Sequence, residues 1–142
     1  MTAQEAFDFL AEGTRTGHLA TVRADGRPHT KPIWFVLEGS PESFTVLFNT
    51  GEGTVAGRNL ARDPRVALSV DDARPPFSYV LVEGTAELVD HVTDVRAGAT
   101  RIGARYMGAD RAEEFGERNG VPGELLVRVT PTRVIAEKDI SD

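Results

Sequence analysis

The sequence predicts a mainly β fold, an antiparallel barrel closed on itself with helices at its periphery. Apolar patterns typical of strands occur about six times, and helical patterns occur about three or four times. Tight turns or one short helix join successive strands, and the long crossovers that parallel sheets need are missing. No internal repeat or low-complexity linker is present, so residues 1–142 are expected to form a single domain.

The first part of the chain is predicted to form one helix and three strands. In Ala3–Thr16, apolar residues such as Phe7 and Leu10 share one stripe of a helix. The turn at Asp25-Gly26 is a strong hairpin signal between the first two strands. Pro32 predicts an edge strand or a bulge, because proline has no N–H to donate to the ladder. The expected strands, taken to form a meander, are His18–Arg23, Pro28–Glu38 and Phe44–Asn49.

The second part is predicted to contain two helical regions and longer strands. Gly84 indicates a bulge or a sharp bend, Gly108 a break in the main helical region, and Pro131 a bend in the last segment. The expected helices are Thr54–Arg62 and Val92–Arg118. The expected strands are Arg65–Asp71, Ser78–Asp90 and Glu124–Ala136, the last in one piece or two.

Composition excludes several kinds of site and partner. The chain has no cysteine, which excludes disulfides, thiolate catalysis and cysteine-ligated metals. His18, His29 and His91 are scattered without metal-ligand spacing, so no metal site is expected. The net charge of −6 comes without the basic face of a nucleic-acid binder. No apolar run approaches the ~20 residues of a membrane span and no basic signal segment opens the chain, so a cytoplasmic protein without a membrane partner is expected.

The stretch Phe44–Leu60 predicts a site for an anion. A strand pattern ends at Asn49-Thr50, the turn Gly51-Glu52-Gly53 follows, and a short helix opens with Thr54 at its N-cap. The first N–H groups of a helix have no intrahelical partner and lie at the positive end of its dipole, so a phosphate can bind there beside Arg58. The stretch is not a P-loop, because GxxxxGK[ST] is absent. The same pattern also fits a helix cap without a ligand, and both interpretations stay open.

Several segments together resemble the split β-barrel flavin and deazaflavin oxidoreductases, which include the pyridoxamine 5'-phosphate oxidase-like FMN proteins. These segments are HLATVRADGRPH, PIWFV, FNTGEGTVAGRNLARDPRVALSV, YVLVEGTAEL and GELLVRVTPTRVI. The resemblance covers about Thr2–Ala136 and is sharpest at Arg58–Val66 and in VEGTAEL. Within this superfamily the chain is most similar to the actinobacterial reductases that use the deazaflavin coenzyme F-420. The resemblance implies a six-stranded antiparallel split β-barrel of the FMN-binding type with peripheral helices, acting as a homodimer.

The resemblance also implies a cofactor groove between two barrels. The ring would lie near Lys31, Pro32, Ile33, Trp34, Asn49 and Thr50. The phosphate would lie at Thr54–Arg58, with Thr54, Val55 and Arg58 as its candidate contacts, and Gly51 and Asn59 complete the candidate cofactor-binding residues of this stretch. Phe77, Ser78 and Tyr79 form a corner that would reach in, from this or the partner subunit. His29 and Tyr79 are candidate proton donors. Many relatives have a phosphate-binding lysine two residues before the arginine of RNL. This chain has Ala56 there, and Lys31 is a candidate replacement.

Most of these residues also have a purely structural interpretation, which the sequence leaves open. Arg58 can form a surface ion pair with Glu52 or Asp63, and Lys31 can face solvent on an edge strand. Trp34 can be buried in the core or in a subunit interface. In the same sense, His29 can be a hairpin surface residue, Asn59 a residue that bonds loop backbone, and Tyr79 a strand aromatic at an interface.

Neither a Ser/His/Asp arrangement nor a pair of carboxylates stands out in the sequence. Their absence suits hydride transfer, in which the cofactor supplies the chemistry. The expected function is transfer of a hydride from reduced F-420 to an electron-poor conjugated molecule such as an enone or a quinone. One alternative is an FMN-binding oxidase or reductase, which Ala56 and the net charge of −6 favour, because FMN has one phosphate and no acidic oligoglutamate tail. The other is a non-catalytic carrier of a cofactor or ligand.

Overall fold

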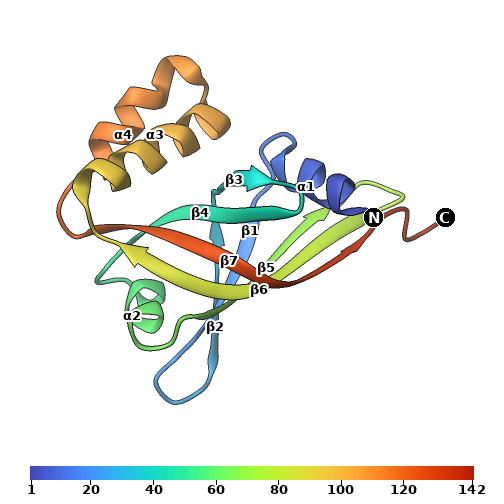
Figure 1. The fold of residues 1–142 in the computed structure, drawn as a ribbon, viewed down its shortest axis with the longest axis horizontal. Coiled ribbons are helices and arrows are strands. Elements are labelled where there is room, and N and C mark those ends of the chain that lie inside the picture. The colour runs from blue at the N-terminus through green and yellow to red at the C-terminus, as the bar shows by residue number, and fades with distance from the viewer.

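Seven strands form one antiparallel sheet in the computed structural model, which describes residues 1–142 (Figure 1). The strands are β1 (Gly17–Val22), β2 (Pro28–Ile33), β3 (Val36–Ser40), β4 (Ser43–Gly51), β5 (Arg65–Asp72), β6 (Ser78–Val89) and β7 (Glu124–Glu137). The helices are α1 (Ala3–Ala11), α2 (Val55–Arg62), α3 (Val92–Met107), the 3-10 helix η1 (Ala109–Arg111) and α4 (Ala112–Asn119). None of the helices has both the length and the apolar character that a bilayer crossing needs.

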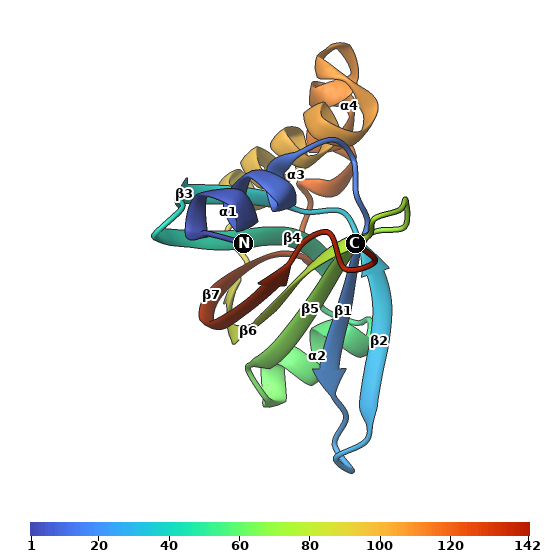
Figure 2. The ribbon, with the colours of Figure 1, turned by 90° about the vertical axis from the view of Figure 1, so that its right-hand side faces the viewer.

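The sheet is open, with the strand order β2-β1-β5-β6-β7-β4-β3. β2 and β3 follow one another in the chain but lie at opposite edges, so the predicted meander of three strands is wrong. The prediction of six strands in a closed barrel is also wrong. The predicted strand Pro28–Glu38 is split at Trp34-Phe35, because the chain leaves one edge there and buries Phe35 completely. Figure 2 shows that the sheet coils, so that β3 and β4 run across the direction of β1, β2 and β5.

Three local predictions about glycine and proline are confirmed. Pro32 lies in an edge strand, where its missing N–H leaves no partner unpaired. The ladder between β6 and β7 shifts register between Glu83 and Gly84, which is the predicted bulge. A Cβ on Gly84 would lie 2.4 Å from the carbonyl oxygen of Thr130, so this close approach needs glycine. Gly108, at φ 103, ends α3.

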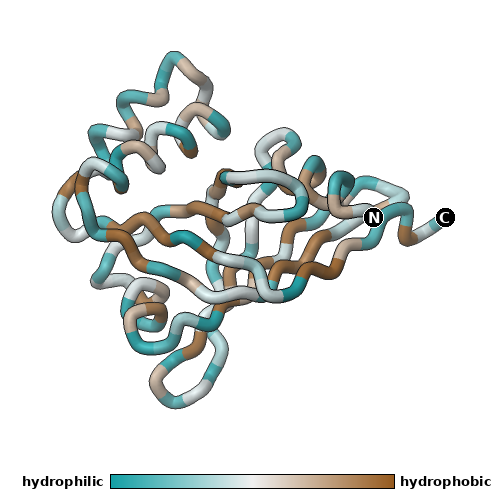
Figure 3. Tube along the Cα trace, viewed as in Figure 1, coloured by the Kyte–Doolittle hydropathy of each residue, from teal (hydrophilic) through white to brown (hydrophobic).

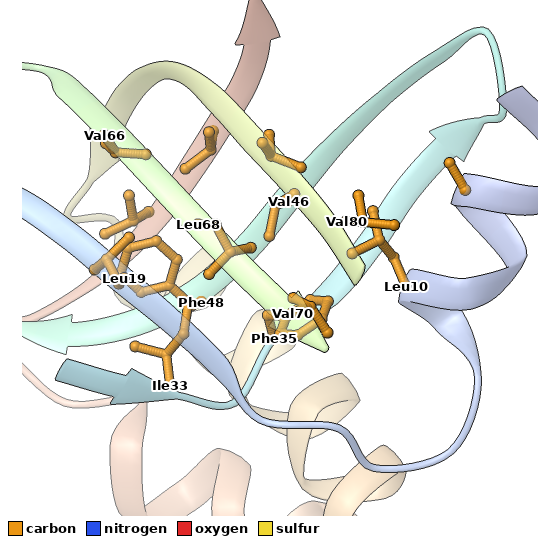
Figure 4. Packing of buried hydrophobic residues seen from close by; sticks show 14 of the residues in the cluster. Leu10, Leu19, Ile33, Phe35, Val46, Phe48, Val66, Leu68, Val70 and Val80 are labelled. Carbon is orange, nitrogen blue, oxygen red and sulfur yellow. The ribbon is translucent and has the colours of Figure 1, made fainter. Parts of the chain in front are cut away.

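The hydrophobic core lies inside the coil of the sheet. Sixteen buried residues form one cluster, to which α1 contributes Leu10 and the strands contribute residues such as Leu19 and Phe48 (Figure 4). α1 covers one end of this core, and it ends before the predicted Thr16 because Gly13 turns the chain at φ 59. Figure 3 shows the same division, with the most apolar stretches along the strands and hydrophilic residues in the turns and in α4.

The helices α3, η1 and α4 form an arm beyond one end of the sheet (Figure 1). The arm is attached through a second apolar cluster, in which Val95 and Ile102 of α3 pack on Val36, Leu47 and Leu126 of the sheet. This attachment brings α3 close to the place where β2 ends, which is the position of the candidate site.

Candidate functional site

The end of β2 lines a cavity that we call the ring cavity. Its volume is about 260 Å³, and its walls come from β2, β4, α3, α4 and β7. The lining residues are Lys31, Pro32, Ile33, Trp34, Asn49, Ile102, Asn119 and Glu124. Five of the residues that the sequence assigned to a ring therefore share one cavity. Ile102, Asn119 and Glu124 are additions that sequence reasoning missed.

Trp34 forms an aromatic wall of the ring cavity. It is 41% exposed, so it is not a core residue of this chain. Its ring stacks on Tyr106 of α3 at 4.9 Å between centroids and 4° between planes. The Tyr106 hydroxyl donates to the carbonyl of Arg15 at 2.7 Å and accepts from the N–H of Phe35 at 3.3 Å, and burial raises the pKa of this phenol. The tyrosine thus stays a proton donor at neutral pH and fixes the chain where Trp34 protrudes.

Arg105 of α3 also bonds the segment around Phe35, which Tyr106 contacts. Its guanidinium donates to the carbonyl oxygens of Phe35 at 2.6 Å and of Leu10 at 2.7 Å. It also donates to the carbonyls of Gly13 at 2.9 Å and Glu12 at 3.3 Å. Burial lowers the pKa of Arg105, although an arginine remains charged at neutral pH. One side chain therefore ties α1 and the start of β3 to α3.

The turn after β4 is built as the sequence predicted, with Thr54 as the N-cap of α2. The Thr54 hydroxyl accepts from the N–H of Gly57 at 3.0 Å, donates to the carbonyl of Gly51 at 2.8 Å and lies 3.0 Å from the Thr50 hydroxyl. Its only proton is therefore engaged within the turn. The N–H groups of Val55 and Ala56 make no hydrogen bond, but Ala56 is completely buried, so the Val55 N–H is the donor that the helix start offers.

One face of α2 lines a second cavity, of about 340 Å³, which we call the arginine cavity. The face consists of positions i, i+3, i+4 and i+7, and the turn between β1 and β2 supplies the opposite wall. The lining residues are Arg23, Ala24, Asp25, Arg27, Val55, Arg58, Asn59 and Arg62. Sequence reasoning found three of them, Val55, Arg58 and Asn59. The helical spacing from Arg58 to Arg62 was a signal for a further one.

Arg58 does not form the surface ion pair that was its structural alternative. Asp63 pairs with Arg65 instead, at 2.7 Å, and the bonds from Arg65 lower the pKa of the Asp63 carboxyl to about 2.

Asn59 has a structural role, as its alternative interpretation proposed, but it bonds side chains and not loop backbone. Its buried amide donates to the Thr21 hydroxyl at 3.0 Å and its oxygen accepts from Arg62 at 3.0 Å.

His29 is not a solvent-facing hairpin residue. It lies opposite Thr21 in the β1–β2 register, and Thr21 bonds Asn59 of α2, so this face of β2 is turned toward α2. Lys31 points to the same face, because side chains alternate along a strand. The Nδ1 atom of His29 is buried and has no hydrogen-bond partner. A buried polar atom without a partner is uncommon in folded proteins.

The corner Phe77-Ser78-Tyr79 does not line the ring cavity. Phe77 is 41% exposed and has φ 62, and Tyr79 is half-buried on β6 opposite Asp71. Ser78 lines a different, charge-rich cavity that also contains Asp8 and the Glu5–Lys138 ion pair. Within one chain, the structure does not bring this corner to the predicted ring residues.

Comparison with known proteins identifies the family. The family described as pyridoxamine 5'-phosphate oxidase matches residues 3–138. A curated relative, the 5a,11a-dehydrotetracycline/5a,11a-dehydrooxytetracycline reductase of Streptomyces rimosus, is 35% identical over 75 residues, which are 50% of this chain and 53% of that protein. The chain thus spans about half the length of this curated relative.

Two solved structures are similar over most of their length. A conserved hypothetical protein from Mycobacterium tuberculosis has a TM-score of 0.85 at 26% identity, covering 99% of this chain and 87% of that one. A protein described as an F-420 reductase has a TM-score of 0.69 at 30% identity, covering 90% and 94%. From the extent of the family match and from these relatives, the chain belongs to the pyridoxamine 5'-phosphate oxidase family of split-barrel proteins.

Proposed function

We propose that this protein is an F-420-dependent reductase whose cofactor ring occupies the ring cavity. The single observation that carries the proposal is the convergence of Lys31–Trp34 and Asn49 in one cavity with an aromatic wall. The reductase relatives from Streptomyces rimosus and among the solved structures support the same activity. When bound, reduced F-420 supplies a hydride from C5 to an electron-poor carbon of a conjugated acceptor and is oxidised by two electrons.

The residues around the ring cavity suit the binding of a planar heterocycle. Trp34 lines the cavity, and its indole is held by stacking on Tyr106 and by a tilted contact with Phe115. The Lys31 ammonium and the Asn49 amide offer hydrogen-bond donors, and we expect them to hold carbonyl oxygens of the ring. Asn49 is itself oriented by a bond to the carbonyl of Leu125 at 3.3 Å. Neither His29 nor Tyr79 of the same chain lines the cavity, so one chain by itself supplies neither of these two candidates as a proton donor there.

The helix start fits the phosphate of such a cofactor. The Val55 N–H at the start of α2 makes no hydrogen bond, and Arg58 lies about one turn further on. Ala56 is completely buried, so this position offers a ligand neither a charge nor a hydrogen-bond donor. The missing lysine charge corresponds to roughly 1.5–3 kcal/mol, or about tenfold or more in affinity.

We expect a homodimer to complete the site. The aromatic wall at Trp34 is 41% exposed in a single chain, and the corner Phe77–Tyr79 stays outside the ring cavity. A second copy that brought this corner over the cavity would shield the reacting carbon from water. Light scattering of the purified protein tests this expectation, and a monomer at micromolar concentration contradicts it.

The proposal is tested by titrating the apoprotein with oxidised F-420 and, in parallel, with FMN. Trp34 is the only tryptophan and lies in the ring cavity, so its emission should be quenched by a bound ring. We expect micromolar or tighter binding of F-420 and weak binding of FMN. Arg58→Ala should weaken F-420 binding by about tenfold at unchanged melting temperature, whereas the exposed Arg133→Ala should leave it unchanged. Unchanged affinity in Arg58→Ala removes that residue from the site.

An FMN-binding oxidase or reductase is the second candidate, because the matched family carries the name of an oxidase and Ala56 supplies no charge for a phosphate. Preference for FMN in the same titration would select it. Tight binding of either cofactor without turnover on enones and quinones would instead indicate a carrier.

A further inference from the structure

Glu124 places a carboxylate in the ring cavity that no other group of the chain bonds. The cavity lining contains one cation, Lys31, and one anion, Glu124, and neither side chain forms a hydrogen bond or an ion pair within the chain. Their charged atoms therefore lie more than 4.0 Å apart. The cavity thus contains a donor and an acceptor that are separate from each other and free to bond a ligand.

The pairing of β4 with β7 turns Glu124 to the same side of the sheet as Asn49. Glu124 lies opposite Gly51 in this ladder, and Asn49 lies two residues before Gly51, so the two side chains are diagonal neighbours on one face. Neighbours of this kind are about 7–8 Å apart. The Glu124 carboxylate and the Asn49 amide are therefore close enough to contact one small ligand.

Gly51 leaves the Glu124 carboxylate uncovered on the side of β4. A Cβ at this position would lie 3.6 Å from Oε1 of Glu124 and 3.3 Å from Cγ2 of Thr54. A longer side chain would fill the space beside the carboxylate. Gly51, which the sequence assigned to cofactor binding, thus contributes by the side chain that it lacks.

The polar groups of the ring cavity match one edge of a flavin-type ring. The pyrimidinedione part of flavins and deazaflavins presents a carbonyl, an N–H and a second carbonyl in a row. Lys31 and Asn49 offer donors for the two carbonyls, but the N–H between them needs an acceptor. An ionised glutamate is acceptor-only, and its bond from an N–H is charge-assisted, hence stronger than a neutral one.

We propose that Glu124 accepts a hydrogen bond from the N–H that lies between the two carbonyls of the bound ring. The inference rests on the proposed function, because it needs a flavin-type ring in the ring cavity. FMN presents the same edge, so this role of Glu124 is independent of which of the two cofactors binds. Glu124 therefore fixes the orientation of the ring and does not select F-420 over FMN.

The test compares a deazaflavin with the same deazaflavin methylated at this nitrogen. Quenching of the emission of Trp34, the only tryptophan, measures both affinities. We expect methylation to weaken binding to the wild-type protein about tenfold or more, because it removes a charge-assisted hydrogen bond. Glu124→Ala should bind the unmethylated ring about tenfold more weakly, and methylation should then cost less than about twofold. Glu137→Ala, which removes an exposed carboxylate at the other end of β7, should behave as the wild type.

The outcomes separate the inference from the proposed function. An equal methylation penalty in wild type and Glu124→Ala overturns the inference, and the proposed function stands because the ring still binds. If Glu124→Ala also has a lower melting temperature, the carboxylate has a structural role near the positive end of α2 instead. If F-420 does not bind and FMN does, the proposed function fails, and FMN with its derivative methylated at the same nitrogen decides the inference by the same criterion. If neither ring binds, both proposals are overturned.

Discussion

Replacing Arg105 by methionine is expected to lower the free energy of unfolding by about 3 kcal/mol. Methionine keeps an unbranched apolar stem of similar length to that of arginine and removes the guanidinium. Of the four carbonyl oxygens that the guanidinium bonds, those of Phe35 and Leu10 are in part-buried bonds and those of Gly13 and Glu12 are in exposed ones.

The magnitude follows from the two part-buried bonds. Water can replace the guanidinium at the exposed carbonyls, so only the bonds at 2.6 and 2.7 Å count fully. A bond to a charged group contributes roughly 1.5–3 kcal/mol, and two at the lower figure give about 3 kcal/mol. Arg105→Lys keeps the charge but has no planar fork, so about half of the loss is expected.

Urea denaturation followed by Trp34 emission measures the effect as a shift of the midpoint at constant slope. Arg101→Met is the matched control, one turn earlier on α3, because Arg101 makes exposed contacts with the Leu37 carbonyl at 2.8 Å and with Glu38. We expect a loss under about 1 kcal/mol there. Equal midpoints for both methionine variants would refute the reasoning that Arg105 ties α1 and β3 to α3.

Three further predictions concern stability, pH and binding. Gly57→Ala should lower the free energy of unfolding by about 1–3 kcal/mol, because the added Cβ would lie 2.2 Å from the carbonyl oxygen of Gly51. Gly53→Ala is the control: a Cβ there would have no atom within 4 Å, so the melting temperature should be nearly unchanged. The pKa of Asp63 is lowered to about 2 by its bonds to Arg65, so the stability it adds is complete above its ordinary pKa of about 3.9 and is lost as pH falls toward 2. Urea midpoints between pH 5 and pH 2 should therefore fall less steeply in Asp63→Asn than in wild type, and parallel curves would contradict this. Trp34→Ala should weaken F-420 binding about tenfold in calorimetry, because base-like rings gain roughly 1–3 kcal/mol from an aromatic platform; equal affinity would mean that the ring does not stack there.

The sequence was a good guide where a local pattern decides the structure. The turn at Asp25-Gly26, the edge position of Pro32 and the break at Gly108 each follow from the backbone of one or two residues. The division of Pro28–Glu38 into β2 and β3 could not be predicted from a local pattern. PIWFVLE is a largely apolar run that looks like one strand. It is divided between the two edge strands of the sheet by the burial of Phe35 in the core and by the bonds from α3 to Phe35.

The candidate site was predictable in part, but from a family resemblance and not from a local pattern. Lys31–Trp34 and Asn49 were found through the family resemblance, and the structure places them in one cavity. Arg23 and Arg27 were missed because they join α2 only through the pairing of β1 with β2 and the contact of Asn59 with Thr21. These are contacts between distant parts of the chain, which no local pattern encodes.

The position of β7 has a consequence for how the protein is made. β7 pairs with β6 on one side and β4 on the other, and it is the only link between the two halves of the sheet. Both partners leave the ribosome well before Glu124–Glu137 does. Until then each has an unpaired edge that can capture a strand of another chain. The newborn protein is therefore at greatest risk of aggregation late in its synthesis, and slow translation between β6 and β7 would lower the yield of folded protein.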